Sequence, residues 1–290
     1  MLLIIFLFII AIIYINIYCK KKYELFSNTN NKYVCLYAYY EKNEQYRNNL
    51  MYFLNNGGIL EDVDYYIIIN GNSSVNIPDL KNIKIIRRKN KGFDFGAWSH
   101  VIQNYLLKSK IYEYYIFINN SVEGPYIPKS KQNKNWLNIF LELFSNEDIK
   151  LVGSTINILD KQLNKPINKK LMDMFDFKIP YTHVQSMFFI LNVDGFNYLN
   201  NLNFFNEKKI NKLKHMDDLI SNYEIGLSQL ILKNNWNINC IVPYYKNLDY
   251  RKIKFNINTS GDDVLYNNAF FGKTLQPEDV IFYKRYRFNL

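Results

Sequence analysis

The sequence predicts a single α/β domain, built on a mostly parallel β-sheet flanked by helices, behind a hydrophobic N-terminal segment. Its strand-like segments are continuous apolar runs rather than alternating ones, which is typical of strands covered on both faces. These runs alternate along the chain with segments of helical periodicity. With 290 residues, the chain is long enough for one large hydrophobic core, whereas a second independent domain would be cramped.

The predicted elements follow one another in a regular order after residue 32. Apolar runs predict strands, and a helical spacing of apolar residues predicts helices. We expect strands at 33–39, 65–69, 83–86, 114–118, 151–153 and 183–191, and helices at 48–54, 97–106, 136–144 and near 194. Residues 155–180 show no clear periodicity, and we expect a loop or an insertion over the site there.

The N-terminus has the composition of a membrane anchor. Residues 2–18 carry no charge, and their length is at the short end of what spans a bilayer as a helix. The basic start and small-residue end of a cleaved signal peptide are missing. We therefore expect a transmembrane anchor at 1–19, a linker at 20–32 and one domain at 33–290. The lysines at 20–22 favour a cytoplasmic location for that domain.

The charge and cysteine content exclude several classes of protein. The net charge is +10, but only six of the 36 basic residues are arginines, and the lysines are scattered among Asn, Ile and Tyr. Such a bias fits codon usage better than a polyanion-binding surface, so no nucleic-acid partner is expected. Three widely spaced cysteines form neither a disulfide framework nor a cysteine-rich zinc site.

Ligands of a parallel sheet bind beyond the carboxyl ends of its strands, so the residues after each run are the candidates. After the third strand, Asn90, Gly92 and Asp94 stand at the start of a helix. Asp94 either caps that helix or binds a ribose or sugar hydroxyl. The neighbouring Arg87 and Arg88 carry planar donors suited to phosphate.

The loop after the fourth strand contains Asn119, Asn120 and Ser121. Amide and hydroxyl oxygens bind Mg²⁺ or Mn²⁺ less strongly than carboxylates do. Either a metal is held by other groups such as Glu123, or cationic side chains replace it; a simple turn is the remaining alternative. The three residues also form a glycosylation sequon, and since a glycan would block the site, they favour the cytoplasmic side.

Two further segments supply polar candidates for the same site. The two-residue period of a strand places His183 and Gln185 on one face, where they either line a sugar pocket or are structural. Near the C-terminus, Lys284 and Arg287 are candidates for binding a diphosphate, with Arg285 between them. A solvated basic tail is the alternative for these cations.

Glu224 is the carboxylate that the pattern singles out. On a helix it shares a stripe with Ile220, Leu227 and Ile231. A carboxylate on an apolar stripe needs a partner or a task, and desolvation is expected to raise its pKa toward that of a general base. The alternative is a buried structural pair.

Taken together, these segments resemble the rhamnan-synthesis F family of polysaccharide glycosyltransferases. The matching stretches are residues 90–98 (NKGFDFGAW), 115–125 (YIFINNSVEGP), 183–189 (HVQSMFF), 224–230 (EIGLSQL) and 272–287. The resemblance implies a GT-A-type fold and transfer of a sugar, with rhamnose as one candidate, from a nucleotide-diphosphate donor to a glycan. It implies that Asp94 and Asn119–Ser121 lie at the donor and that Glu224 activates the acceptor.

The sequence departs from the wider superfamily because no aspartate pair follows the fourth strand, which leaves dependence on Mn²⁺ or Mg²⁺ open. The expected reaction is a single displacement with inversion, in which Glu224 accepts the proton of the acceptor hydroxyl. The alternative is a catalytically inactive membrane protein that binds nucleotide sugars or glycans. A nucleic-acid-binding protein is the least supported interpretation.

Overall fold

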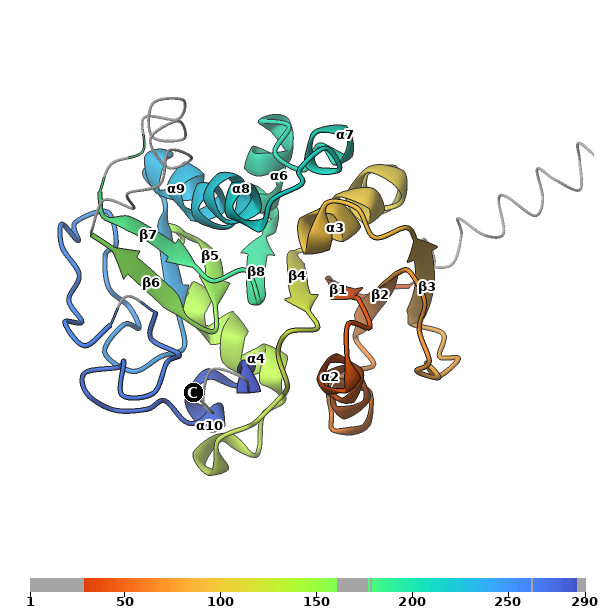
Figure 1. Cartoon of the computed structure of the whole chain (residues 1–290), viewed down its shortest axis with the longest axis horizontal. Helices are drawn as coiled ribbons and strands as arrows, with labels where there is room; N and C mark the ends of the chain where they lie inside the picture. The colour runs from red at the N-terminus through yellow and green to blue at the C-terminus, as the bar shows by residue number, and fades with distance from the viewer. Residues whose placement is uncertain (1–28, 161–176, 178, 262, 286–290) are drawn as a thin grey trace, which may run out of the picture.

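The computed structural model describes residues 29–160, 177, 179–261 and 263–285 (Figure 1). The strands are β1 (Tyr33–Tyr39), β2 (Val63–Asn70), β3 (Ile83–Arg88), β4 (Tyr114–Asn119), β5 (Ile149–Gly153), β6 (Ile156–Leu159), β7 (Tyr181–Val184), β8 (Phe188–Asn192) and β9 (Asn237–Cys240). The α-helices are α2 (Glu44–Asn55), α3 (Phe93–Asn104), α4 (Trp136–Leu141), α6 (Val193–Asn201), α7 (Glu207–Ile210), α8 (Met216–Leu219), α9 (Gly226–Lys233) and α10 (Pro277–Val280). Short 3₁₀ turns are η1 (Leu106–Lys108), η2 (Lys129–Lys131) and η3 (Glu142–Phe144), and η4 (Ile220–Ile225) is a π-turn.

Within the described residues, seven strands form one sheet in the order β3-β2-β1-β4-β8-β5-β9. β8 runs antiparallel to both of its neighbours, and the other pairs are parallel. The predicted α/β class with a mostly parallel sheet is therefore confirmed. β1 is hydrogen-bonded to β2 on one side and to β4 on the other, so the order of the strands reverses at β1. This switch point is where such sheets bind ligands.

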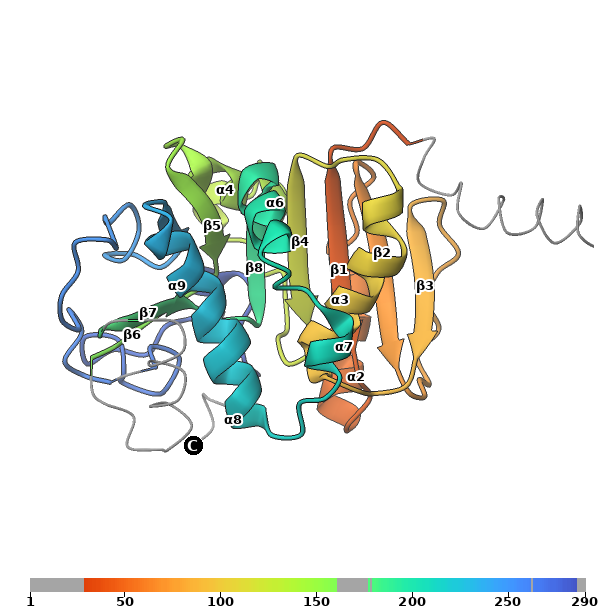
Figure 2. The same ribbon diagram turned by 90° about the horizontal axis from the view of Figure 1, so that it is seen from above.

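Helices cover both faces of the sheet, as the continuous apolar strands require (Figures 1 and 2). α3, α6, α8 and α9 lie on one face, and α2 and α4 lie on the other. Trp98 of α3 shows how the layers are joined, because its indole N–H donates to the Leu36 carbonyl at 3.0 Å. Its ring also meets Phe117 and Phe189 edge-on, at 5.5 Å in each case. Such edge-to-face aromatic contacts add to the energy of burial.

The strand expected at 183–191 is two strands in different sheets. β7 pairs with β6 in a two-stranded sheet, and β8 belongs to the main sheet. Between the two strands, the backbone N–H of Ser186 donates to the side chain of Glu224 at 2.9 Å. β6 itself lies in the stretch where no element was expected. Of the expected insertion, residues 161–176 and 178 lie outside the described part.

The helix that carries Glu224 is also less regular than expected. α8 and α9 are continuous through the π-turn η4, whose turn is wider than that of an α-helix. The predicted apolar stripe is therefore broken: Leu227 and Ile231 are fully buried, whereas Ile220 is 37% exposed. The extra residue in the turn rotates the residues before it out of register with those after it.

The membrane anchor stays a prediction. In the part of the chain that the structure describes, no helix is both long and apolar enough to cross a bilayer. The predicted anchor at residues 2–18 and most of the linker lie outside the described residues.

Two glycines in the helices beside the cavity predict opposite effects on stability. A Cβ at Gly96 would lie 2.3 Å from the Lys91 carbonyl oxygen, so Gly96→Ala should lower the free energy of unfolding by about 1–3 kcal/mol. A Cβ at Gly226 would meet no atom closer than 3.7 Å, and Gly226→Ala should raise that free energy by up to about 1 kcal/mol through helix propensity. Urea denaturation of both variants measures the difference. Equal stability of the two variants would contradict the packing described here.

Candidate functional site

A cavity of about 520 Å³ opens at the carboxyl ends of β1, β2 and β4, beside the switch point. The first turn of α3 and the helix from α8 to η4 form its other walls. It is lined by Ala38, Tyr40, Lys42, Tyr46, Asn70, Asn90, Phe93, Asp94, Asn119, Asn120, Ser121, Ser186, Met216, Leu219, Ile220, Glu224 and Lys284. The size and the mixture of apolar walls with a few polar groups are typical of small-molecule sites.

Most of the side chains predicted for the site meet in this cavity. Those that line it are Asn90, Asp94, Asn119, Asn120, Ser121, Glu224 and Lys284. Gly92 is the N-cap of α3 and supports the wall from behind, in a left-handed conformation with φ of 67°. His183 and Gln185 do not line the cavity, and Arg287 lies outside the described residues.

Asp94 is held in the first turn of α3 and faces the loop after β4. The cap residue of the helix is Gly92, so the interpretation of Asp94 as the N-cap is wrong. One oxygen of Asp94 accepts a hydrogen bond from its neighbour's amide, Phe95 N–H, at 2.9 Å, and the other accepts from the Asn119 amide at 2.8 Å. These two bonds fix the carboxyl group between α3 and β4.

The pKa of Asp94 is shifted toward neutrality. Burial raises it to about 6, and the nearby carboxylate of Glu224 acts in the same direction. The hydrogen bonds from Asn119 and Phe95 and the charge of Lys284 oppose this rise. Asp94 therefore changes its charge within the range in which enzymes commonly work.

The loop after β4 uses its amides to bind the protein itself. The Asn119 side-chain oxygen accepts from the Ser121 backbone N–H at 3.0 Å, and its NH₂ group donates to Asp94. Asn120 donates to the Tyr40 carbonyl at 2.8 Å, and its own carbonyl accepts from Asn49. These bonds fasten the loop to the end of β1. The Asn119 amide oxygen also accepts from the Ser121 hydroxyl, so both of its lone pairs are already engaged.

Glu224 projects from η4 into the cavity with 15% of its side chain exposed. Its Oε2 accepts from Ser186 twice, from the backbone N–H at 2.9 Å and from the hydroxyl. Its Oε1 lies 3.7 Å from Nε2 of His183. Burial raises the pKa of Glu224, but His183, Lys284 and the Ser186 bonds together outweigh burial and lower it. The expected rise of this pKa is therefore wrong, because the strand break supplies donors that the pattern of apolar residues does not show.

The described residues of the cavity include two carboxylates, Asp94 and Glu224, as candidate ligands for Mn²⁺ or Mg²⁺. Among the described residues, no three His, Cys, Asp or Glu side chains gather closely enough to hold a metal ion. Glu123, which was one alternative for holding a metal, is paired with Arg285 and Tyr126. The cavity instead contains the ammonium group of Lys284, which acts electrostatically on both Asp94 and Glu224.

Two of the arginines considered for phosphate binding, Arg88 and Arg285, serve the scaffold. Arg88 donates to the Asn70 side chain at 2.6 Å, to the Lys91 carbonyl at 2.9 Å and to the Asn211 side chain at 3.0 Å. It thereby ties the ends of β2 and β3 to the segment after α7. Arg285 is engaged by Glu123. Among the residues that the structure describes, the cations lining the cavity are therefore lysines, Lys42 and Lys284.

Gln185, the other predicted polar residue of the strand, is structural. Its side chain accepts from the Thr155 hydroxyl at 2.6 Å and donates to Asp263 at 3.2 Å, away from the cavity. The sequence interpretation missed Ser186, which contacts Glu224 directly. It also missed Tyr40 and Lys42, although these residues follow β1 and the rule used for the other strand ends would have found them.

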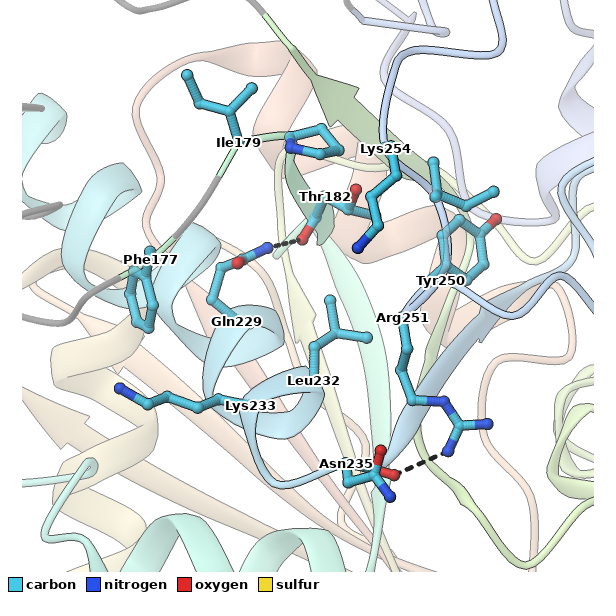
Figure 3. A pocket seen from close by; sticks show the side chains of 12 residues that line it. Phe177, Ile179, Thr182, Gln229, Leu232, Lys233, Asn235, Tyr250, Arg251 and Lys254 are labelled. Atoms are coloured by element: carbon cyan, nitrogen blue, oxygen red, sulfur yellow. Dashed lines mark hydrogen bonds between the residues drawn. The ribbon is translucent and has the colours of Figure 1, made fainter.

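A second cavity of about 340 Å³ lies at the far end of α9 (Figure 3). Lys233, Arg251 and Lys254 stand around it, with Thr182 and Gln229 between them. Arg251 is already bound to Asp249 at 2.7 Å, to Asp148 at 3.1 Å and to the Asn235 carbonyl at 2.8 Å. None of the predicted site residues lines this cavity.

Neither a known family profile nor a curated protein matches the sequence. Solved structures with a similar fold include a mannosyltransferase from Pyrobaculum calidifontis in complex with GDP-mannose and Mn²⁺ (6% identity, 74% of this chain and 55% of that chain, TM-score 0.41). A mannosyltransferase from S. cerevisiae is 10% identical over 71% of this chain and 67% of that chain, with a TM-score of 0.39. A galactosyltransferase with donor and acceptor sugar analogues is 10% identical over 66% of this chain and 70% of that chain, with a TM-score of 0.33.

These similarities do not carry the chemistry of those enzymes to this chain. Every identity is below 25% and every TM-score below 0.5. The chain also spans only about half of the Pyrobaculum enzyme. The function therefore has to be argued from the cavity itself.

The raised pKa of Asp94 predicts a pH-dependent stability. Below pH ~4 the carboxyl is protonated in both the folded and the unfolded chain, and between pH ~4 and ~6 the folded chain retains the proton more strongly. Its contribution to the free energy of unfolding is thus lost as the pH rises through about 6. The difference between wild type and Asp94→Asn should fall by about 2 kcal/mol from pH 4 to pH 7. Urea denaturation at both pH values measures this, and a constant difference would contradict the burial of Asp94.

Proposed function

We propose that this protein is an inverting glycosyltransferase that moves a sugar from a nucleoside-diphosphate donor to a glycan acceptor. The observation that carries the proposal is the cavity at the switch point, where an ionised carboxylate, Glu224, and an ammonium group, Lys284, face one space. Sugar transfer from a diphosphate needs both a base for the acceptor hydroxyl and a positive charge for the leaving group.

The donor fits the cavity by the chemistry of its walls. Lys284 and Lys42 supply positive charge for the diphosphate, and the partly exposed ring of Tyr40 offers a flat apolar surface for the base. Asp94 stands at the start of α3, where its carboxyl group can accept a hydrogen bond from a ribose or sugar hydroxyl. Asn90 and Ser121 line the same wall and add polar groups for orientation.

The chemical step is one displacement at the anomeric carbon. The acceptor oxygen forms a bond to this carbon as the bond to the diphosphate oxygen breaks on the opposite face, so the configuration inverts. The acceptor proton passes to Glu224, and the nucleoside diphosphate leaves with its charge balanced by the lysines. The lowered pKa of Glu224 keeps the carboxylate ionised and ready to accept the proton at neutral pH.

The finer identity of the reaction rests on the resemblance to the rhamnan-synthesis F family. That resemblance supports rhamnose as a candidate donor sugar and a growing polysaccharide as the acceptor. The apolar residues 2–18 support attachment to a lipid membrane, and the lysines that follow them support a cytoplasmic catalytic domain.

Replacing Glu224 by Gln tests the base. Glu224→Gln keeps the shape of the side chain but cannot accept the proton, so kcat should fall by about 10²–10⁴-fold while donor affinity stays within about twofold. Sugar transfer is followed by product analysis, and donor binding is followed by thermal shift. Glu207→Gln, which changes a carboxylate bound to His100 outside the cavity, is the matched control. Near-normal turnover of Glu224→Gln would sink the assignment.

Lys284 is tested together with the metal requirement. In this proposal Lys284 supplies the positive charge that balances the leaving diphosphate, so transfer should persist in EDTA. Lys284→Met should lower kcat/KM for the donor by about 10–100-fold, because that charge is lost. Lys254→Met, at the second cavity, should have no effect. Loss of transfer in EDTA with recovery in Mn²⁺ would overturn the role given to Lys284.

The second candidate function is a catalytically inactive protein that binds nucleotide sugars or glycans. The missing aspartate pair after β4 and the strong hydrogen bonding of Glu224 favour it. It predicts thermal stabilisation by a nucleotide sugar. It also predicts that neither transfer nor hydrolysis of that donor occurs, with or without added Mn²⁺.

A further inference from the structure

The carboxylate of Glu224 is contacted by β7 and by the short segment that joins β7 to β8. His183, the third residue of β7, is 2% exposed, and Ser186 follows two residues after the strand ends. Both contact the same side chain, His183 through Nε2 at 3.7 Å from Oε1 and Ser186 through two hydrogen bonds to Oε2. Because the Ser186 bonds go to Oε2, Oε1 is the oxygen left to an acceptor hydroxyl in the cavity.

The orientation of the His183 ring follows from its other nitrogen. Nδ1 lies 2.9 Å from the Tyr181 carbonyl oxygen. A carbonyl only accepts hydrogen bonds, so Nδ1 carries a proton and Nε2 is the nitrogen turned toward Glu224. An unprotonated Nε2 would oppose its lone pair to the carboxylate, whereas a protonated Nε2 forms an ion pair with it. The Tyr181 carbonyl thus fixes the ring, with Nε2 toward Glu224.

The backbone around this contact gives up regular structure. Strand structure is interrupted at residues 185–187, where Ser186 contacts Glu224. Glu224 itself lies in the π-turn η4, where the helix widens. π-turns are rare in α-helices overall, but those that occur are often found at functional sites. Two independent irregularities therefore converge on one carboxylate, although an ordinary structural ion pair would require neither.

We propose that His183 and Ser186 are positioning residues for sugar transfer, which hold Glu224 with Oε1 toward the acceptor. This inference rests on the proposed role of Glu224 as the base. His183 does not touch the acceptor in this arrangement, since it lies behind the carboxylate and outside the lining of the cavity.

Four groups face Glu224 and decide its charge. His183 comes from β7, Ser186 from the segment after it, Lys284 from the C-terminal segment and Asp94 from α3. Burial raises the pKa of Glu224, and His183 is the largest of the opposing influences, ahead of Lys284 and Ser186. Without the imidazolium, burial is opposed only by the weaker groups, so the pKa of Glu224 should rise.

The decisive variant is His183→Gln. The amide of glutamine can still donate to Glu224, but it carries no charge at any pH. The acidic limb of the kcat profile, where Glu224 gains its proton, should move up by about one pH unit, whereas kcat on the plateau and KM for the donor should change by less than about tenfold. An unshifted limb in a folded His183→Gln protein would overturn the proposal.

The chain offers a matched control in a second histidine–glutamate pair. His100 of α3 lies 2.9 Å from Glu207 of α7, outside the cavity and in a more exposed position than the His183–Glu224 pair. His100→Gln should leave the acidic limb where it is. Ser186→Ala supplies an independent variant should His183→Gln fail to fold. Loss of the Ser186 hydroxyl bond to Glu224 should also move the acidic limb of the kcat profile to higher pH, and it should lower kcat. Ser186→Thr, which restores a hydroxyl, should recover most of the loss.

A titration that needs no turnover separates this inference from the proposed function. In protein labelled with ¹³C at the glutamate carboxyl carbons, the Glu224 signal is assigned by its absence from Glu224→Gln. Its midpoint should rise in His183→Gln by about one pH unit and stay unchanged in His100→Gln. Failure of wild type to transfer any sugar would refute the proposed function, whereas an unmoved midpoint would refute the coupling of His183 to Glu224.

Discussion

The structure depends on one constraint, which is that β1 pairs in parallel with strands on both of its sides. Parallel strands end at the same edge of a sheet, so the residues after β1, β2 and β4 are brought together there. The aromatic layer under α3, with Trp98 at its centre, holds that helix against the sheet at the same edge. The wall of the cavity at the ends of β1, β2 and β4 is therefore a product of strand order.

Burial at this edge of the sheet disfavours the ionised form of both carboxyl groups in the cavity, and the two groups differ in how far their neighbours offset it. Asp94 is the less compensated of the two carboxylates, and its pKa is raised to about 6. Glu224 is surrounded by donors and positive charges, and its pKa is lowered. The same cavity thus contains one carboxyl group that is easily protonated and another that stays ionised. Such divergence between neighbouring acids is a common basis for different roles in one site.

Much of this arrangement was accessible from the sequence. Continuous apolar runs identified β1, β2 and β4 because these strands are buried on both faces, and the rule of strand ends then pointed to Asp94 and to Asn119–Ser121. The partners of these residues were not accessible. The pattern of apolar residues does not show that Ser186 donates to Glu224 or that Arg88 donates to Asn70. Such contacts join segments that are distant in sequence.

The π-turn η4 separates two parts of one helix that face different surroundings. Met216 and Leu219, before η4, form a wall of the cavity, and Leu227 and Ile231, after it, belong to the core. In a regular α-helix each residue advances by about 100°, so removing one residue from the turn would swing the earlier wall around the helix axis by that angle. The π-turn contains one residue more than an α-helical turn. This extra residue lets one helix line the cavity before the turn and pack into the core after it.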